Sequence, residues 1–313
     1  IGIHYEACHN SLPMPEPNPD VKSKRWPVIL IRILARLPLP VLYTLADMLF
    51  ILFFHLLRFQ RALVKENLGR AFPEQSSRAI HRLAAQSYRR AIHILFETIK
   101  CLSISDDDLA QRIEIQNTEL IDSLLSQHGT ILAAASHHCN WEWLQLACSA
   151  RLGVPLAVIY KSLNHSGIDT LLLQIRGRYG SKLIEAKSAL PALVGFTRQP
   201  GIIAVVADQG PRPDEEKYWS RFLGRDTAFF PGLEKLALLL KAPVVFVHMT
   251  RVRRGHYRIR FEGLAEPPYR QQSGIVMEPY IQALERQIVE APQDWFWAYK
   301  RWKYKKPVYE PRH

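Results

Sequence analysis

A histidine and a glutamate five positions apart, His137 and Glu142, are the residues whose types and spacing point most directly to chemistry. A carboxylate beside an imidazole fixes its tautomer and stabilises its charged form, so that the other ring nitrogen acts as a base. Such a pair can take a proton from an alcohol. The spacing alone is a weak signal, because it arises by chance in most chains of this length. The plain alternative is a surface histidine near an acidic residue in the first turn of a helix.

The neighbouring sequence predicts that both residues lie where a strand ends and a helix begins. Thr130–Ala135 is a short apolar run typical of a buried strand, and Trp141–Arg151 has a helical pattern. From about residue 115 such runs alternate, which predicts an α/β fold with a central, mostly parallel sheet flanked by helices. Gly255–Tyr257 predicts a turn into a late antiparallel strand. The other predicted strands are Leu156–Tyr160, Ser181–Ile184, Ile202–Ala207, Ala242–Met249 and Tyr257–Glu262, and the other predicted helices are Asp169–Tyr179, Ala189–Arg198, Pro231–Leu240 and Val276–Glu290.

Three parts are expected along the chain. Residues 1–25 are polar and proline-rich, which predicts a poorly ordered segment without the pattern of a cleavable signal peptide. Residues 26–57 are the most apolar part and are expected to be a membrane anchor or interfacial helices. Residues 58–313 are expected to form the α/β domain, which opens with two amphipathic helices. Ser76 or Ser77 is the predicted N-cap of the second helix.

The apolar segment allows three interpretations. Leu37–Leu57 has 21 residues, and about 20 are needed to cross a bilayer. Asp47 lies in its middle, while Arg32 and Arg36 interrupt the part before it, and a charge in lipid costs roughly 3 kcal/mol. A spanning helix, a pair of helices dipping into one leaflet, and an ordinary helical hairpin of the core therefore remain open. The first two place the protein at a membrane.

The net charge of +12 predicts an anionic partner. No zinc-finger spacing or RNA-binding motif is present, so an anionic membrane surface is favoured over nucleic acid. The four cysteines form no Cys-x-x-Cys pair, which fits a reducing compartment. Adjacent His137, His138 and Cys139 point in different directions and make poor metal ligands, so no metal is expected. Cys139 as a nucleophile is a minor alternative.

Other segments that could contribute to a site lie at the ends of predicted strands and at the start of a predicted helix. Tyr160 and Lys161 end one strand, Asp208 and Gln209 end another, and Phe229–Ala237 opens a helix. In open α/β sheets, ligands lie beyond the carboxyl ends of the strands. Their convergence with His137 favours a functional site.

The ordered motifs resemble those of the lipid A biosynthesis late acyltransferase family, a branch of the glycerolipid acyltransferase superfamily. The resemblance covers about residues 30–305. It rests on Lys65–Glu74, Ser136–Glu142, Tyr160-Lys161, Arg176–Gly180, Ala207–Gln209, Phe229–Ala237, Lys241–Val245, Leu284–Ile288, Ala291–Trp297 and Lys300–Lys303.

This resemblance implies transfer of a fatty acyl chain from acyl carrier protein to a hydroxyl of a lipid A precursor, during lipopolysaccharide biosynthesis at the cytoplasmic face of a bacterial inner membrane. It implies no cofactor and no metal. By the same resemblance, His137 is the general base and Glu142 its charge partner. The further residues are Arg176 or Arg178 for an oxyanion or phosphate, and Asn140, Tyr160, Lys161, Asp208 and Gln209 for the acceptor.

Two departures from the family pattern bear on these expectations. Ser136 and Cys139 stand where the family's Gly-His-x-Gly-Asn-Trp-Glu has glycine, and residues 210–219 form a longer segment than is usual. A lysophospholipid or aminolipid acceptor therefore remains an alternative. A basic membrane-binding protein without catalysis is another. The Trp295–Trp302 cluster is predicted to serve packing and interfacial anchoring.

Overall fold

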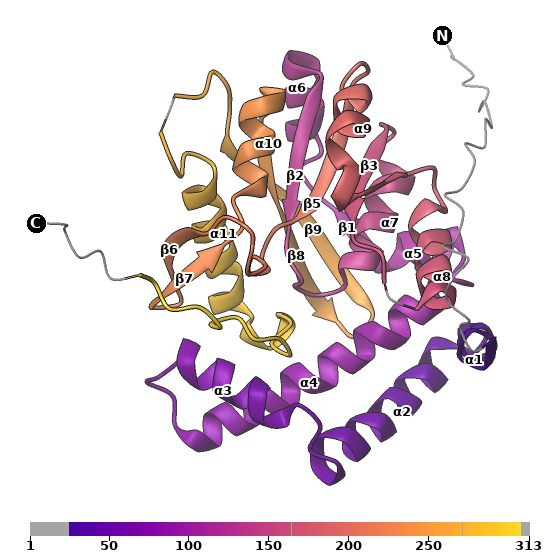
Figure 1. Cartoon of the computed structure of the whole chain (residues 1–313). Coiled ribbons are helices and arrows are strands. Elements are labelled where there is room, and N and C mark those ends of the chain that lie inside the picture. The colour runs from indigo at the N-terminus through magenta and orange to yellow at the C-terminus, as the bar shows by residue number, and fades with distance from the viewer. Residues whose placement is uncertain (1–24, 164, 271, 308–313) are drawn as a thin grey trace, which may run out of the picture.

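The computed structural model describes residues 25–163, 165–270 and 272–307, so the prediction for residues 1–25 lies almost wholly outside the described residues. A seven-stranded sheet forms the centre, in the order β1-β9-β8-β2-β5-β3-β4 (Figure 1). β9 is antiparallel to β8, whereas every other neighbouring pair is parallel. The predicted α/β fold and its late antiparallel strand are confirmed. The strands are β1 (Ile113–Ile115), β2 (Thr130–Ala135), β3 (Leu156–Tyr160), β4 (Lys182–Glu185), β5 (Gly201–Val206), β8 (Val244–Arg253) and β9 (His256–Ala265).

Helices cover both faces of this sheet because alternate side chains of each strand point to opposite sides. Ile131 and Ala133 of β2 pack into one core with Trp143, while Leu132 and Ala134 pack into the other with Phe246. Figure 1 shows α10 and α11 on one side of the sheet and α7 and α8 on the other. These and the remaining helices of this part are α5 (Asp106–Arg112), α6 (Glu119–His128), α7 (Trp141–Arg151), α8 (Ser166–Gly177), η2 (Ala186–Ser188), α9 (Ala189–Phe196), α10 (Gly232–Leu240), α11 (Met277–Glu290) and η3 (Pro292–Asp294).

A separate two-stranded hairpin follows β5 and was not expected from the sequence. It consists of β6 (Tyr218–Phe222) and β7 (Arg225–Phe229), joined by Leu223 and Gly224. Both turn residues have positive φ, as a two-residue hairpin turn that matches the strand twist requires. The turn sequence is Leu-Gly and not the usual Asn-Gly. Because leucine rarely adopts positive φ, this sequence did not predict a hairpin turn.

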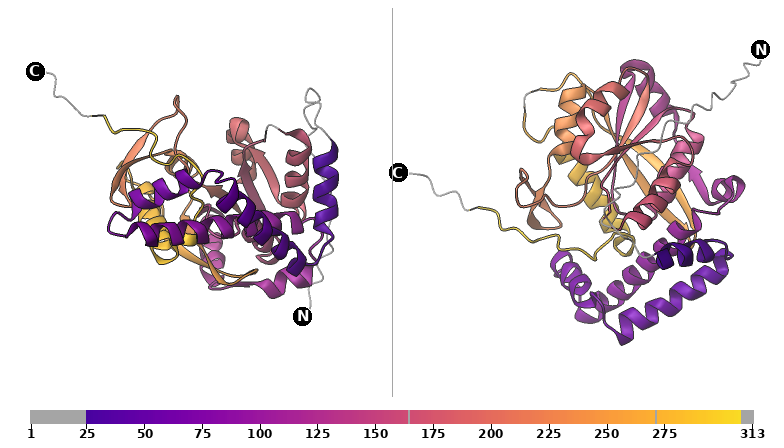
Figure 2. Two further views of the ribbon diagram at one scale, coloured as in Figure 1. Left: turned by 90° about the horizontal axis from the view of Figure 1, so that it is seen from below. Right: turned by 45° about the vertical axis from the view of Figure 1, so that its right-hand side comes forward.

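From residue 25 onward, the elements before α5 and the sheet are helical: α1 (Arg25–Ala35), α2 (Leu39–Phe50), the π-helical turn η1 (Ile51–Leu56), α3 (Arg61–Ala71) and α4 (Ser77–Lys100). Ser76 caps α4, because its Oγ accepts a hydrogen bond from the Ala79 N–H at 3.2 Å. α2 runs antiparallel along α4 beneath the sheet (Figures 1 and 2). Within the described residues, Leu39–Leu56 is the one helical stretch long and apolar enough to cross a membrane.

Candidate active site

His137 lies at the carboxyl end of β2, and the carboxylate that binds its ring is Asp208. The imidazole Nδ1 lies 2.7 Å from Asp208 Oδ1, and the His137 backbone N–H donates to Oδ2 at 2.9 Å. Asp208 is fully buried, so it does not line an acceptor pocket as the family resemblance implied. It instead holds Nδ1 in its protonated form and leaves Nε2 as the basic nitrogen. Gln209 Nε2 lies 3.5 Å from that nitrogen.

The segment after α11 fixes both members of this pair. The buried Trp295 indole N–H donates to Asp208 Oδ2 at 2.7 Å. The Phe296 N–H donates to the His137 carbonyl at 3.0 Å. The buried Asp208 carboxylate therefore has three hydrogen-bond partners, which are the His137 ring, the His137 backbone N–H and the Trp295 indole N–H. Trp295 therefore contacts the site directly, which the prediction of packing and interfacial anchoring did not include.

Glu142 binds Arg176 and not His137, which changes the predicted pairing. Its two carboxylate oxygens accept from Arg176 Nε at 2.9 Å and from Nη2 at 2.5 Å. This is a bidentate pair, and the Glu142 side chain is buried. Glu142 lies in the first turn of α7 and Arg176 in the last turn of α8, so the packing of these two helices sets the contact. Its charge still acts on His137 through space.

The pKa of His137 is raised above its ordinary value of 6.5. Burial lowers it, but the charge of Asp208, its hydrogen bond and the charge of Glu142 together outweigh burial. Burial raises the pKa of Asp208, whereas the His137 charge and hydrogen bonds lower it, and the net direction is downward. The pair therefore favours a charged imidazole beside an ionised carboxylate, the state reached after a proton has been taken.

Two apolar cavities meet at His137. The larger has a volume of about 700 Å³ and lies among α1, α3, α4, α8 and the segment after α11. The second, which we call the inner cavity, has a volume of about 560 Å³ and lies between α7 and the sheet. His137, Trp141, Glu142, Leu163 and Arg176 line both cavities. A substrate in either cavity can therefore reach the basic nitrogen.

The structure brings some of the predicted acceptor residues to this site and not others. Tyr160, Lys161 and Gln209 line the inner cavity. Asn140 is fully buried: its Oδ1 caps α7 through the Trp143 N–H, and its Nδ2 donates to Glu97. The prediction that Asn140 contacts the acceptor therefore does not fit its position.

Arg178 is also away from the site. Its Nη2 pairs with Asp106 at 2.8 Å, and it lines neither cavity. It follows α8, whose last turn has already directed Arg176 toward Glu142. Arg176 is therefore the arginine of the predicted pair that lies beside His137.

Cys139 occupies the second of the two positions where the family pattern has glycine, and its φ is 55°. The turn after β2 thus keeps a left-handed residue although the side chain is not glycine. The Cys139 N–H donates to the Asp294 carbonyl at 2.8 Å, which ties the turn to the C-terminal segment. The thiol is buried and burial raises its pKa, which makes it a poor nucleophile.

Ser136, at the other glycine position, is buried with its Oγ 3.1 Å from Gln287 Oε1. Within the described ranges, His, Cys, Asp and Glu side chains do not gather in a group of three that would hold a metal.

The fold is an open α/β sheet with an imidazole–carboxylate pair at its carboxyl edge, and two apolar cavities meet at that pair. These features are those expected of an enzyme that acts on substrates with hydrocarbon chains. A sequence model of the bacterial lipid A biosynthesis acyltransferase family matches residues 23–304, and the chain belongs to this family. A lipid A biosynthesis acyltransferase of Haemophilus influenzae is 21% identical over 247 residues, covering 78% of this chain and 76% of that protein. The resemblance predicted from the motifs is confirmed, and membership supports acyltransferase activity on a lipid A-type acceptor.

Proposed function

We propose that this enzyme transfers a fatty acyl chain from acyl carrier protein to a hydroxyl on an acyl chain of a lipid A precursor, giving an acyloxyacyl group. The observation that carries this proposal is the position of His137 where two apolar cavities meet. A reaction between two hydrocarbon chains needs an apolar space for each chain and a base between them.

His137 would act as the general base. Its Nε2 takes the proton of the acceptor hydroxyl while Nδ1 stays bonded to Asp208. The resulting alkoxide attacks the thioester carbonyl, a carbon–oxygen bond forms, and the carbon–sulfur bond then breaks. The imidazolium returns its proton to the departing thiolate, so no covalent acyl-enzyme is needed. Asp208 orients the ring throughout.

Arg176 would stabilise the anionic oxygen of the tetrahedral intermediate. Glu142 engages Nε and Nη2, which leaves Nη1 for a ligand. Because the Glu142–Arg176 pair lines both cavities, a charge that develops near His137 meets a fixed cation in an apolar surrounding. Glu142 in this account positions Arg176 and adds negative charge near His137.

The inner cavity is assigned to the donor chain. Its walls come from the small and aliphatic residues Ala133, Val158 and Ala204 of the sheet and from Leu144 and Cys148 of α7. A single alkyl chain fits such a slot, and its depth would measure acyl length. Lys161, which lines this cavity and is exposed, together with the net charge of +12, fits an acidic carrier protein.

The larger cavity is assigned to the acceptor. Near His137 its walls include Trp141, Phe296 and Leu163, and these apolar side chains suit a hydroxyl carried on an acyl chain better than one on a sugar. Glycolipid phosphates would remain outside, near the basic surface. Membership of the lipid A biosynthesis acyltransferase family supports the further proposal that the enzyme acts at the cytoplasmic face of a bacterial inner membrane.

Mass spectrometry of lipid A tests the proposal. Cells without the protein should lack one acyl mass on lipid A, and the wild-type chain should restore it. His137→Ala, expressed to the same level in membranes, should not. A change confined to phospholipids or aminolipids would replace the proposed acceptor, and restoration by His137→Ala would remove His137 as the base.

A further inference from the structure

The helices before the α/β domain expose apolar side chains in regular stripes. Trp26, Ile29, Leu30 and Ile33 follow the i, i+3, i+4, i+7 spacing of one helix face, and all are exposed. Such a stripe on α1 would ordinarily be buried in a core. Here it faces away from the protein, so it calls for an apolar surrounding.

The outer side of α2 and η1 repeats this pattern. Val41, Met48 and Leu52 are exposed, while Leu42 and Ala46, on the opposite side, are buried against the body of the protein. Both faces of the helix are thus apolar, although only one has a protein partner. The exposed series continues through Leu56 at the end of η1 and through Leu57 and Phe59 after it.

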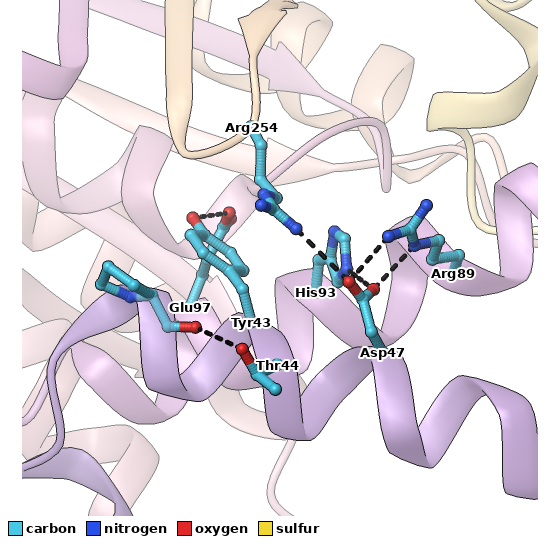
Figure 3. Close-up of polar contacts among 8 residues, drawn as sticks. Tyr43, Thr44, Asp47, Arg89, His93, Glu97 and Arg254 are labelled. Atoms are coloured by element: carbon cyan, nitrogen blue, oxygen red, sulfur yellow. Dashed lines mark hydrogen bonds and ion pairs between the residues drawn. The ribbon is translucent and has the colours of Figure 1, made fainter.

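Asp47 shows how this apolar helix is oriented. Its carboxylate binds Arg89 through Nε and Nη2, both at 2.7 Å, His93 Nε2 at 2.7 Å and Arg254 Nη1 at 3.4 Å (Figure 3). Arg89 and His93 belong to α4, and Arg254 to the turn between β8 and β9. The charge in the middle of the apolar segment is therefore paired with residues of α4 and of the β8–β9 turn.

The attachment of α2 to α4 extends along its length. Tyr43 Oη donates to Glu97 at 2.7 Å, as Figure 3 shows. Lys100 Nζ donates to the Leu37 carbonyl, just before α2, at 3.0 Å. The rings of Phe54 and Tyr88 lie 5.4 Å apart at the other end. A helix fastened at successive turns to a polar helix cannot cross a bilayer unless that helix enters with it. α4 carries exposed Arg78 and Arg82, for which lipid is a costly surrounding.

The larger cavity opens among the same apolar elements. Its lining includes Ile31 of α1 and Phe59 after η1, together with Leu95 of α4 and Leu163 before α8. Phe59, Leu95 and Leu163 are exposed as well as cavity-lining, so they form an apolar rim.

Charge complementarity identifies the surrounding as an anionic leaflet. Asp47 is the single acidic residue between Trp26 and Lys65, and it is neutralised internally. The basic residues of the same stretch are Arg32, Arg36, Arg58, Arg61 and Lys65. A helical segment with exposed apolar faces and a positive net charge is suited to the interface of an anionic membrane.

We propose that α1, α2 and η1 lie within one leaflet of an anionic bilayer without crossing it, and that the apolar rim of the larger cavity opens into that leaflet. The placement of the helices stands independently of the reaction. The assignment of the apolar rim as the entrance for the lipid acceptor rests on the proposed function. Lipid then reaches His137 without passing through water.

Vesicle flotation tests the surface with the purified full chain. Ile29→Asp with Leu57→Asp places charges on two side chains that are 56% and 60% exposed, and the matched control is Val289→Asp with Leu239→Asp, at 56% and 55%. Binding to phosphatidylethanolamine–phosphatidylglycerol vesicles should fall about tenfold or more in the first variant and stay at the wild-type level in the control. Equal loss in both variants, or no loss in the first, would overturn the proposal. A soluble dimer that buries these helices and does not bind vesicles would also overturn the proposal.

Cysteine labelling tests the in-plane orientation. Arg36→Cys and Ala62→Cys, made separately with Cys8→Ser, lie at exposed positions on either side of α2 and η1. In inverted inner-membrane vesicles, a membrane-impermeant maleimide should label both. Protection of one site alone would mean that the segment spans the bilayer. Neither experiment requires acyl transfer, so each outcome is separable from a failure of the proposed function.

Discussion

His137 and Asp208 occupy the same register position beyond two neighbouring parallel strands. β2 and β5 pair from Thr130 with Gly201 to Ala135 with Val206. The same offset of two residues beyond each strand reaches His137 and Asp208, whose side chains are 2.7 Å apart. The sheet itself therefore brings base and carboxylate together, which gives the pair a rigid support.

Activity should fall as the pH is lowered, because the base must be neutral to accept a proton. The His137 pKa lies above 6.5, so the decline should begin above the pH at which an ordinary histidine titrates. The dependence of kcat/KM on pH measures this, with vesicle-bound substrate at each pH. A plateau that extends below pH 6 would be incompatible with a raised His137 pKa.

Arg176 and Arg178 should differ sharply. Arg176→Ala removes the cation beside the reacting carbonyl and should lower kcat by about 10²–10³-fold. It also leaves Glu142 buried without its partner, at a cost of about 3 kcal/mol in unfolding free energy. Arg178→Ala removes an exposed pair worth at most about 1 kcal/mol and should leave kcat close to wild type. Equal losses of kcat would argue against the assigned role of Arg176.

The inner cavity should set the length of the donor chain. Cys148→Phe adds a ring to the wall of that cavity and should shift preference toward shorter acyl chains. Each methylene excluded is worth roughly 1–3 kcal/mol, so the ratio of kcat/KM between donors two carbons apart should change by about tenfold or more. A donor series on acyl carrier protein measures the ratio. An unchanged preference in a folded variant would place the donor elsewhere.

Glycine should suit position 139 better than alanine. The backbone there has φ of 55°, a conformation that costs a residue with a Cβ about 1 kcal/mol relative to glycine. Cys139→Gly should therefore unfold with a free energy about 1 kcal/mol higher than Cys139→Ala, although alanine fills more space. Urea unfolding of both variants makes the comparison. Greater stability of the alanine variant would contradict it.

Local elements followed closely from the sequence because their signals are local. β2, β3 and α7 have the predicted bounds, and Ser76 is one of the two predicted caps. Strong apolar runs and a capping serine act over a few residues, so no knowledge of the fold is needed. The β6–β7 hairpin lacked such a signal because its turn uses leucine.

The partners of the site residues depended on tertiary packing. β5 lies between β2 and β3 in the sheet, although β3 follows β2 in sequence. Only this strand order shows that Asp208, and not the nearby Glu142, meets the His137 ring. Trp295 reaches Asp208 from 87 residues away. Sequence spacing could identify these polar residues as candidates but could not assign their contacts.

The rate and pH profile of Asp208→Asn test the central claim most directly, since the substitution keeps the shape of the side chain and removes its charge. The claim predicts that kcat/KM for acyl transfer falls by about 10³–10⁴-fold. The remaining activity should decline at a lower pH than in the wild type, because burial then lowers the His137 pKa without opposition from the Asp208 charge. A folded Asp208→Asn protein with wild-type kcat/KM and an unshifted profile would contradict the account.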